Sequence, residues 1–294
     1  MKTLRDICSL AFMLAIIAGC ERSNDSTGTV VTGTAHAADD VVIAYDVRGR
    51  GDITPVFIHG WACDRSFWRE QLDVFASDYR VVGLDLGGHG DSQADRDVWS
   101  IAILGGDVQA VVRELNLKEV VLIGHSLGGV VALEAAHLMP EQVMGIVGVD
   151  ALHDAEEQYT EEIVRQVADD FKANFKETTS TFVRQMFPED TDPALVEWVI
   201  SKACSANQQF ILAIILETPN LNIKKRFMAA KVPIHCINAA PFPPMNTETK
   251  IETNRKYADF DVVMMKGVGH FPMLERPAEF NMHLRKILSE MISQ

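Results

Sequence analysis

The feature that most constrains this chain is the stretch Val121 to Gly129, in which an apolar run breaks into glycines around a single serine, Ser126. Residues 119–123 form a buried-strand pattern, and residues 130–138 predict a helix that Pro140 ends. Glycines two positions before and after the serine leave room for a tight turn, where a side chain would collide with the neighbouring strand or helix. The pattern predicts a strained strand–turn–helix unit that exposes a serine hydroxyl.

Strand and helix patterns alternate along the chain from Asp40 onward, which is typical of a mostly parallel sheet covered by helices on both faces. The 294 residues, 47% of them hydrophobic, suffice for one large α/β domain. The run 41–49 is expected at an antiparallel edge, and Ser66 is expected to cap a helix that reaches Ala76. Further strands are expected at 55–60, 80–86, 143–149, 232–238 and 261–266, with helices at 101–115 and 277–291.

Residues 151–226 interrupt this alternation, because they contain helical patterns and no strand-like run. We expect a helical cap inserted after the strand that ends at Asp150, with the core domain formed by residues 40–150 and 227–294. The helical patterns lie at 161–175, 180–187, 193–203 and 208–216.

The N-terminus has the pattern of a targeting segment, with Lys2 and Arg5 before an apolar run over 7–18 that is too short to span a membrane permanently. Ile17-Ala18-Gly19-Cys20 resembles the lipobox of bacterial lipoproteins. The resemblance implies that residues 1–19 are a signal peptide and that Cys20 is lipidated. It also implies a periplasmic protein anchored to a membrane, and Glu21 favours the outer membrane.

Residues 20–39 are rich in Ser, Thr, Asn and Gly, which predicts a flexible tether between lipid and domain. The alternative is an ordinary secretory signal cut after Ala37, although that site lies further from the apolar run than such sites usually do. Cys63, Cys204 and Cys236 remain in the domain and do not form the pattern of a disulfide framework.

A formal net charge of −14 and the lack of any Lys/Arg-rich run argue against nucleic acid as a partner. The sequence contains no metal-ligand cluster and no dinucleotide fingerprint, so we expect neither a metal nor a cofactor. Oligomeric state is not predicted by any pattern in the chain.

Three motifs occur in the order Phe57-Ile-His-Gly-Trp61, Gly124-His-Ser-Leu-Gly-Gly129 and Gly267-Val-Gly-His270-Phe-Pro-Met-Leu-Glu-Arg-Pro277. Together they resemble the α/β-hydrolase superfamily from about Val41 to Ser293. The resemblance implies an eight-stranded sheet and a serine hydrolase, but it says little about substrate.

Ser126 is a poor nucleophile as an alcohol, so a base must take its proton, and His270 on the loop after the last strand is the expected base. Backbone amides hold the negative charge that develops on a carbonyl oxygen during attack, and we expect them from Leu127 and Trp61. By contrast, we expect His59, His89 and His125 to order backbone.

Packing is the expected role of Trp68, and Asp85 is expected to order the turn over 87–92.

The acidic residue that would support His270 departs from the commonest family pattern, because residues 237–246 at the end of the post-cap strand and after it contain no carboxylate. Asp150 ends the strand after the serine helix, where some relatives carry the acid, and it is the predicted third member of a triad. Glu248, or a dyad without an acid, is the alternative.

Serine at this turn indicates acyl transfer to water, whereas an aspartate would indicate a dehalogenase or an epoxide hydrolase. The predicted substrate is a carboxylic ester or lactone with an apolar acyl group that enters between sheet and cap. Amidase, C–C hydrolase and perhydrolase chemistry on the same residues stay open, as does a non-catalytic binding lipoprotein. Aromatic residues of the cap either line this pocket or form the interior of the cap: Phe171, Phe175, Phe182, Phe187, Trp198 and Phe210.

Overall fold

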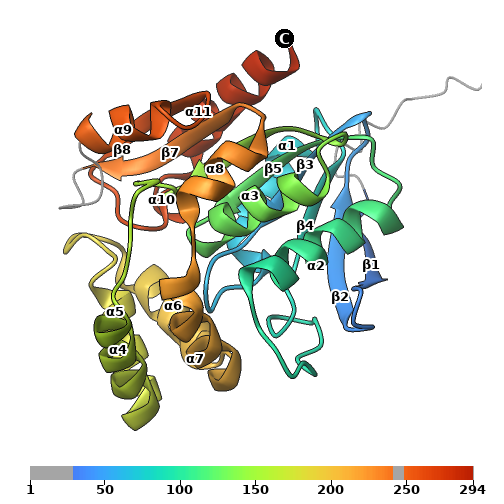
Figure 1. Cartoon of the computed structure of the whole chain (residues 1–294). Helices are drawn as coiled ribbons and strands as arrows, with labels where there is room; N and C mark the ends of the chain where they lie inside the picture. Colours follow the sequence, from blue (N-terminus) through green and yellow to red (C-terminus); the bar gives the residue numbers. More distant parts are fainter. Residues whose placement is uncertain (1–28, 241–247, 294) are drawn as a thin grey trace, which may run out of the picture.

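The computed structural model describes residues 29–240 and 248–293, which form an eight-stranded sheet with helices on both faces (Figure 1). The strand order is β1-β2-β4-β3-β5-β6-β7-β8. β1 and β2 are antiparallel to their neighbours, and the other strands run parallel. The predicted fold class is confirmed. The strands are β1 Val31–His36, β2 Val42–Arg48, β3 Ile53–Ile58, β4 Val81–Leu84, β5 Glu119–His125, β6 Val143–Val149, β7 Ile234–Ala240 and β8 Phe260–Lys266.

Helices cover the sheet in two layers, and almost every residue of the central strands between them is buried. Right-handed crossovers place the helix between β3 and β4 on the opposite face from those that flank β5. One layer contains α2 (Ile101–Glu114), α3 (Leu127–Leu138) and α8 (Ile223–Ala230), which pack against one another. The other contains α1 (Arg69–Phe75) and α11 (Pro277–Ile292). Because β3 to β8 run parallel, their carboxyl ends share one edge of the sheet, and α3 begins at that edge.

The N-terminal edge of the sheet differs from the prediction, because β1 lies inside the segment predicted as a tether. β1 pairs along β2 from Val31 opposite Val47 to His36 opposite Val42, and Ala35 is buried. The prediction of a flexible tether is therefore wrong for the part of residues 20–39 that forms β1. Residues 20–28 lie outside the described residues. β1, and not β2, is the edge strand.

Residues 161–217 form four helices, α4 Glu161–Ala173, α5 Phe175–Arg184, α6 Pro193–Cys204 and α7 Gln208–Glu217, followed by the short turn η2 Thr218–Asn220. They lie beyond the carboxyl edge of the sheet (Figure 1). α8 packs against α3, so the predicted cap boundary at residue 226 falls within a helix of the core.

No single helix in the described part of the chain is long and apolar enough to cross a bilayer. Within those same residues, α6 and the α7–η2 segment together have that length and composition, but the pair is bent by 89°.

Smaller differences concern helix starts. Asp64, and not Ser66, caps the turn before α1, because its carboxylate accepts the Ser66 N–H at 2.9 Å in front of the turn η1 (Arg65–Trp68). Three short helices were not predicted: α8, α9 (Glu248–Arg255) and α10 (Pro272–Glu275). Trp68 is fully buried against Phe57, as expected for a packing residue.

Arg96 ties the segment after β1 to the core. Its guanidinium, only 2% exposed, binds Asp39 at 2.7 Å and pairs with the fully buried carboxylate of Asp107. We predict that Arg96→Met lowers the free energy of unfolding by about 3–5 kcal/mol, because Asp107 is left as an unpaired buried charge. Urea unfolding measures the loss. Arg165→Met, which breaks an exposed pair with Glu161, is the control and should cost less than about 1 kcal/mol. Equal effects of both substitutions would contradict this role.

Candidate active site

Ser126 stands in a strained turn between β5 and α3. Its φ of 52° and ψ of −118° are rare for a residue with a side chain, and such conformations cost about 1–3 kcal/mol. A Cβ on Gly124 would lie 2.2 Å from the carbonyl oxygen of Gly128, and one on Gly128 would lie 2.5 Å from that of Ile58. Neither position therefore accepts a side chain. The turn leaves the Ser126 residue partly exposed at the end of β5.

His270 lies on the loop after β8 and contacts Asp150 directly. Its Nδ1 is 2.6 Å from Oδ2 of Asp150, which follows β6. The other carboxylate oxygen accepts the N–H of Ala239 at 2.9 Å. Burial raises the pKa of Asp150, but the hydrogen bond and the charge of His270 outweigh it and hold that pKa below its usual value. The carboxylate is therefore ionised at neutral pH and accepts the Nδ1 proton.

The backbone of the His270 loop is held from several sides. His125 Nε2 is 2.8 Å from the carbonyl oxygen of His270, and the His270 N–H donates to Met186 of the cap at 2.9 Å. Burial lowers the pKa of His125 to about 3, so its ring is neutral at neutral pH and Nε2–H donates to that carbonyl. Glu275 accepts the N–H groups on either side of His270, from Gly269 at 2.8 Å and Phe271 at 3.1 Å.

The loop after β3 passes directly against the serine. A Cβ on Gly60 would lie 3.2 Å from the Cβ of Ser126, and Trp61 follows at once. His59 fixes this loop, because its Nδ1 lies 2.8 Å from the Gly60 carbonyl oxygen and its Nε2 accepts the Leu86 N–H at 3.0 Å. Leu127 is the first residue of α3. The two predicted oxyanion residues, Trp61 and Leu127, thus flank Ser126 from the β3 loop and from the helix N-terminus.

The histidines expected to order backbone do make backbone contacts: His59 and His125 as given above, and His89 through Nδ1, 3.1 Å from the Gly87 carbonyl oxygen. Asp85 orders the turn after β4, as expected, by accepting the Asp91 N–H at 2.9 Å and the Arg65 N–H at 2.7 Å. Within the described residues, no group of three His, Cys, Asp or Glu side chains is arranged to hold a metal ion.

Aromatic residues of the cap pack on aromatic residues of the core around the site, rather than only within the cap. Phe171 and Phe182 meet the Trp61 ring edge-on, with centroid distances of 5.4 and 5.8 Å. Phe187 stacks on Phe271, next to His270, at 5.0 Å. Further ring contacts between core and cap are Phe67 with Trp198, His89 with Phe210 and Trp99 with Phe210. These rings form an apolar interface between cap and core beside Ser126.

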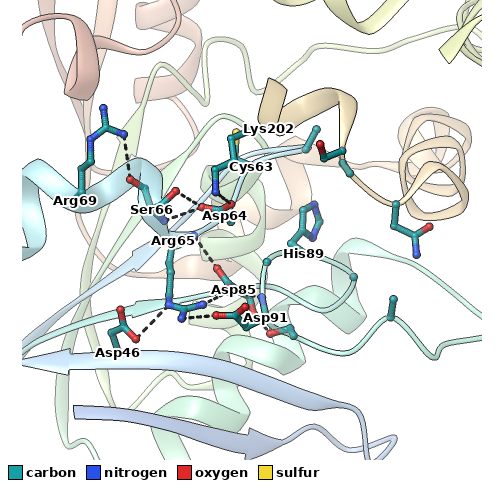
Figure 2. Close-up of a pocket in the computed structure, with 18 of the residues that line it drawn as sticks. Asp46, Cys63, Asp64, Arg65, Ser66, Arg69, Asp85, His89, Asp91 and Lys202 are labelled. Carbon is teal, nitrogen blue, oxygen red and sulfur yellow. Dashed lines mark hydrogen bonds and ion pairs between the residues drawn. The ribbon is translucent and has the colours of Figure 1, made fainter. Parts of the chain in front are cut away.

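A cavity of about 700 Å³ lies between cap and core next to this interface (Figure 2). Its walls come from the loops after β3 and β4 and from the α6–α7 junction, and none of Ser126, Asp150 or His270 lines it. Charged side chains neutralise one another there. Arg65 pairs with Asp46 at 3.2 Å and with Asp91 at 2.7 Å. Lys202 of the cap binds Asp64 of the core at 2.7 Å. The cavity is a side cleft, and the pair of Lys202 with Asp64 links the cap to the core there.

Several residues that hold the site were not singled out from the sequence. Glu275 lies within the third motif, which could have indicated it. Asn238 was noted only as part of a segment without a carboxylate, and Asn254 lies in a helix that was not predicted. Both asparagines are buried and bond the loop that follows Asp150. The side chain of Glu248, the alternative acid, lies outside the described part of the structure.

The sheet order and the strained serine turn between β5 and α3 are those expected of an α/β-hydrolase, and comparison with known families gives the same assignment. Residues 56–282 match the model of the Alpha/beta hydrolase family, so the chain belongs to this family. Epoxide hydrolase 4 of Mus musculus is 34% identical over 128 residues, which cover 43% of this chain and only 35% of that protein.

Solved structures resemble almost the whole chain. An esterase from Thermogutta terrifontis has a TM-score of 0.77 at 21% identity and covers 90% of this chain and 99% of its own. An enol-lactonase from Burkholderia xenovorans LB400 has a TM-score of 0.76 at 17% identity and covers 89% of this chain and 100% of its own. At these identities the similarity establishes a shared fold.

The contact of Asp150 with His270 generates a prediction about the acid. Asp150→Asn should lower kcat by as much as ~10⁴, the scale seen when the imidazole tautomer of a triad is wrong, with circular dichroism unchanged. Glu248→Gln should stay within a few fold of wild type, which is about 1 kcal/mol or less in activation free energy. Steady-state kinetics on one ester compares the two variants. A larger loss in Glu248→Gln would move the acid to the loop after β7.

Proposed function

We propose that this protein is a serine hydrolase that cleaves carboxylic esters or lactones through an acyl-enzyme on Ser126. The observation that carries the proposal is the hydrogen bond between His270 and the ionised Asp150, at the same sheet edge as a serine in a strained turn. A base whose Nδ1 proton is held by a carboxylate presents Nε2 as a proton acceptor. That is the requirement for activating an alcohol.

The proposed reaction begins when Ser126 Oγ attacks the carbonyl carbon and its proton passes to Nε2 of His270. Asp150 stabilises the imidazolium, and the N–H groups of Trp61 and Leu127 hold the negative charge on the carbonyl oxygen. The tetrahedral species collapses when the C–O bond to the alcohol breaks and His270 returns the proton to the departing oxygen. Water, activated by the same histidine, then releases the acid. In a lactone the alcohol stays attached to the product.

The identity of residue 126 distinguishes the proposed reaction from epoxide hydrolysis, the activity in the name of one relative. Epoxide opening through an alkyl-enzyme ester needs a carboxylate nucleophile, and this chain carries Ser126 instead. The cap–core interface supports an apolar acyl group, because aromatic rings from both sides meet at Trp61. Amide, C–C and perhydrolase chemistry use the same residues, so a panel of esters, lactones and amides is needed to choose among them.

A fluorophosphonate probe reacts only with an activated serine. Its reaction therefore also distinguishes a serine hydrolase from the alternative, a binding protein without catalytic activity. We predict labelling of wild type, and loss of both labelling and ester hydrolysis in Ser126→Ala. The free energy of unfolding should change by no more than about 1 kcal/mol, because the hydroxyl contributes little packing. Mass spectrometry of the labelled peptide identifies the site. Labelling that persists in Ser126→Ala would place the active serine elsewhere.

We also propose that Cys20 is lipidated and that the lipid anchors the protein to the outer membrane, with the domain in the periplasm. Cys20 lies outside the described residues, and the proposal rests on the lipobox-like sequence. The alternative cut after Ala37 would remove β1, whose Ala35 is buried in the sheet. Val31, the first residue of β1, pairs with Val47, and the neighbouring Arg48 pairs with the first residue of β4. β1 therefore begins at the amino ends of the parallel strands, whereas the cap lies beyond their carboxyl ends. The start of β1 is therefore on the side of the domain away from Ser126.

Cys20→Ala should release the protein from membranes or leave it unprocessed, because a thiol is needed to carry the lipid. Cell fractionation with mass spectrometry of the N-terminal peptide measures this, and wild type under the same expression is the control. A variant that still fractionates with membranes at mature size and carries a lipid would refute the anchor.

A further inference from the structure

The loop that carries Asp150 has an unfavourable backbone conformation. Asp150 has a φ of 41° and Leu152 a φ of 55°, in the left-handed region that residues with side chains rarely adopt. Such conformations persist only where the surrounding structure over-determines them. The loop is also buried, since Ala151, Leu152 and Ala155 are each at most 6% exposed. Its backbone N–H and C=O groups therefore need protein partners.

Asn238 of β7 supplies two of those partners. Its Oδ1 accepts the Ala151 N–H and its Nδ2 donates to the Ala151 carbonyl, both at 3.1 Å. These bonds fix which end of the amide is oxygen, because an N–H can bond only Oδ1 and a carbonyl only Nδ2. The next residue, Ala239, donates its N–H to Asp150. Adjacent residues of β7 thus hold the carboxylate and the residue after it.

Asn254 of α9 holds the far end of the same loop. Its Oδ1 accepts the Ala155 N–H at 2.7 Å, and its Nδ2 donates to the carbonyls of Leu152 at 2.9 Å and His153 at 3.2 Å. Its side chain is fully buried. Two buried amides therefore fix the loop between Asp150 and Ala155.

Asn238 also sets the orientation of a second imidazole beside the carboxylate. Its Nδ2, a donor, lies 3.3 Å from Nδ1 of His153, so that nitrogen is the acceptor and Nε2 carries the ring N–H. His153 Nε2 lies 3.9 Å from Oδ1 of Asp150. One oxygen of the carboxylate thus faces His270 and the other faces Ala239 and His153.

We propose that Asn238 is a positioning residue for the reaction, acting on His270 through Asp150. It holds the strained loop and directs His153 Nε2–H toward the carboxylate, so that Oδ2 stays aligned with His270 Nδ1. This inference rests on the proposed function and adds a requirement to it. An aspartate at 238 would not replace the amide, because an ionised carboxylate only accepts and cannot donate to the Ala151 carbonyl.

Other titratable groups also face this carboxylate and His270, and each has a partner. Glu275 is held by the N–H groups of Gly269 and Phe271, and His125 by the His270 carbonyl. The Cys236 thiol is fully buried, and burial raises its pKa, so it stays neutral. A change in pH dependence on altering Asn238 therefore reports on Asp150, His153 and His270.

The test compares Asn238→Ala, Asn238→Ser and the matched core variant Val112→Ala, which removes buried apolar volume from α2. In Asn238→Ala, we expect kcat to fall by about 10²-fold, the scale of a small misplacement of a catalytic group, with KM within a few fold. The acidic limb of the kcat/KM profile should move to lower pH, because the misaligned carboxylate stabilises the imidazolium less. Asn238→Ser, which keeps a polar side chain at this position, should lose less activity and shift less.

Val112→Ala should lower the melting temperature without moving the pH profile. Fluorophosphonate labelling of wild type separates the two proposals: an unlabelled wild type refutes the proposed function itself. A labelled wild type with unchanged kcat and pH profile in Asn238→Ala refutes the positioning role alone. Equal behaviour of Asn238→Ala and Val112→Ala would also refute it, since Asn238 would then only stabilise the fold. If Asn238→Ala does not fold, Asn238→Ser decides by the same criteria.

Discussion

The hydrogen bond between His270 and Asp150 is the contact on which the rest of the site depends, because it joins the ends of two strands that are not neighbours. β7 lies between β6 and β8, so the carboxylate after β6 must reach across β7 to the loop after β8. β7 does more than separate them. It supplies the Ala239 N–H to the carboxylate and the Asn238 amide to the next residue. The acid is thus placed by a strand that carries no carboxylate itself.

Two of the strained residues in the site directly follow neighbouring strands. Ser126 after β5 and Asp150 after β6 both have positive φ, and the Ser126 N–H donates to the Val149 carbonyl at 3.0 Å. Each strained residue is held by contacts from other parts of the fold. Close packing of Gly60 and Gly128 against the neighbouring backbone holds the serine turn, and buried amides hold the acid loop. Rigid support of this kind keeps reacting groups aligned without reorganisation during the reaction.

The sequence predicted the features that depend on local patterns. The glycines around Ser126 and the apolar strands 119–123 and 143–149 require only neighbours in the chain, and they predicted the turn and the position of Asp150. β1 was missed because its sequence, with glycine and threonines, has little apolar surface, and its pairing with β2 comes from backbone hydrogen bonds. The roles of Asn238 and Asn254 were also missed. Their partners in the loop after Asp150 lie 85 or more positions away, so no local pattern indicates them.

Aromatic contacts and an ion pair join cap and core at different places. Aromatic rings meet around Trp61 and Phe271, next to Ser126 and His270, whereas the ion pair of Lys202 with Asp64 lies at the side cleft. Burial of aromatic surface contributes more to such an interface than partly exposed ion pairs do. The cap also contacts the loop of His270 directly, since the Met186 carbonyl accepts the His270 N–H. The position of His270 therefore depends on the cap as well as on the sheet.

The most direct test of this account is a crystal structure of the protein after reaction with a phosphonate that mimics the tetrahedral intermediate. The account predicts phosphorus bonded to Ser126 Oγ, with a phosphoryl oxygen about 2.7–3.1 Å from the N–H nitrogens of Trp61 and Leu127. It also predicts that His270 Nδ1 remains bonded to Asp150. An adduct on another residue, or a phosphoryl oxygen directed away from both amides, would contradict it.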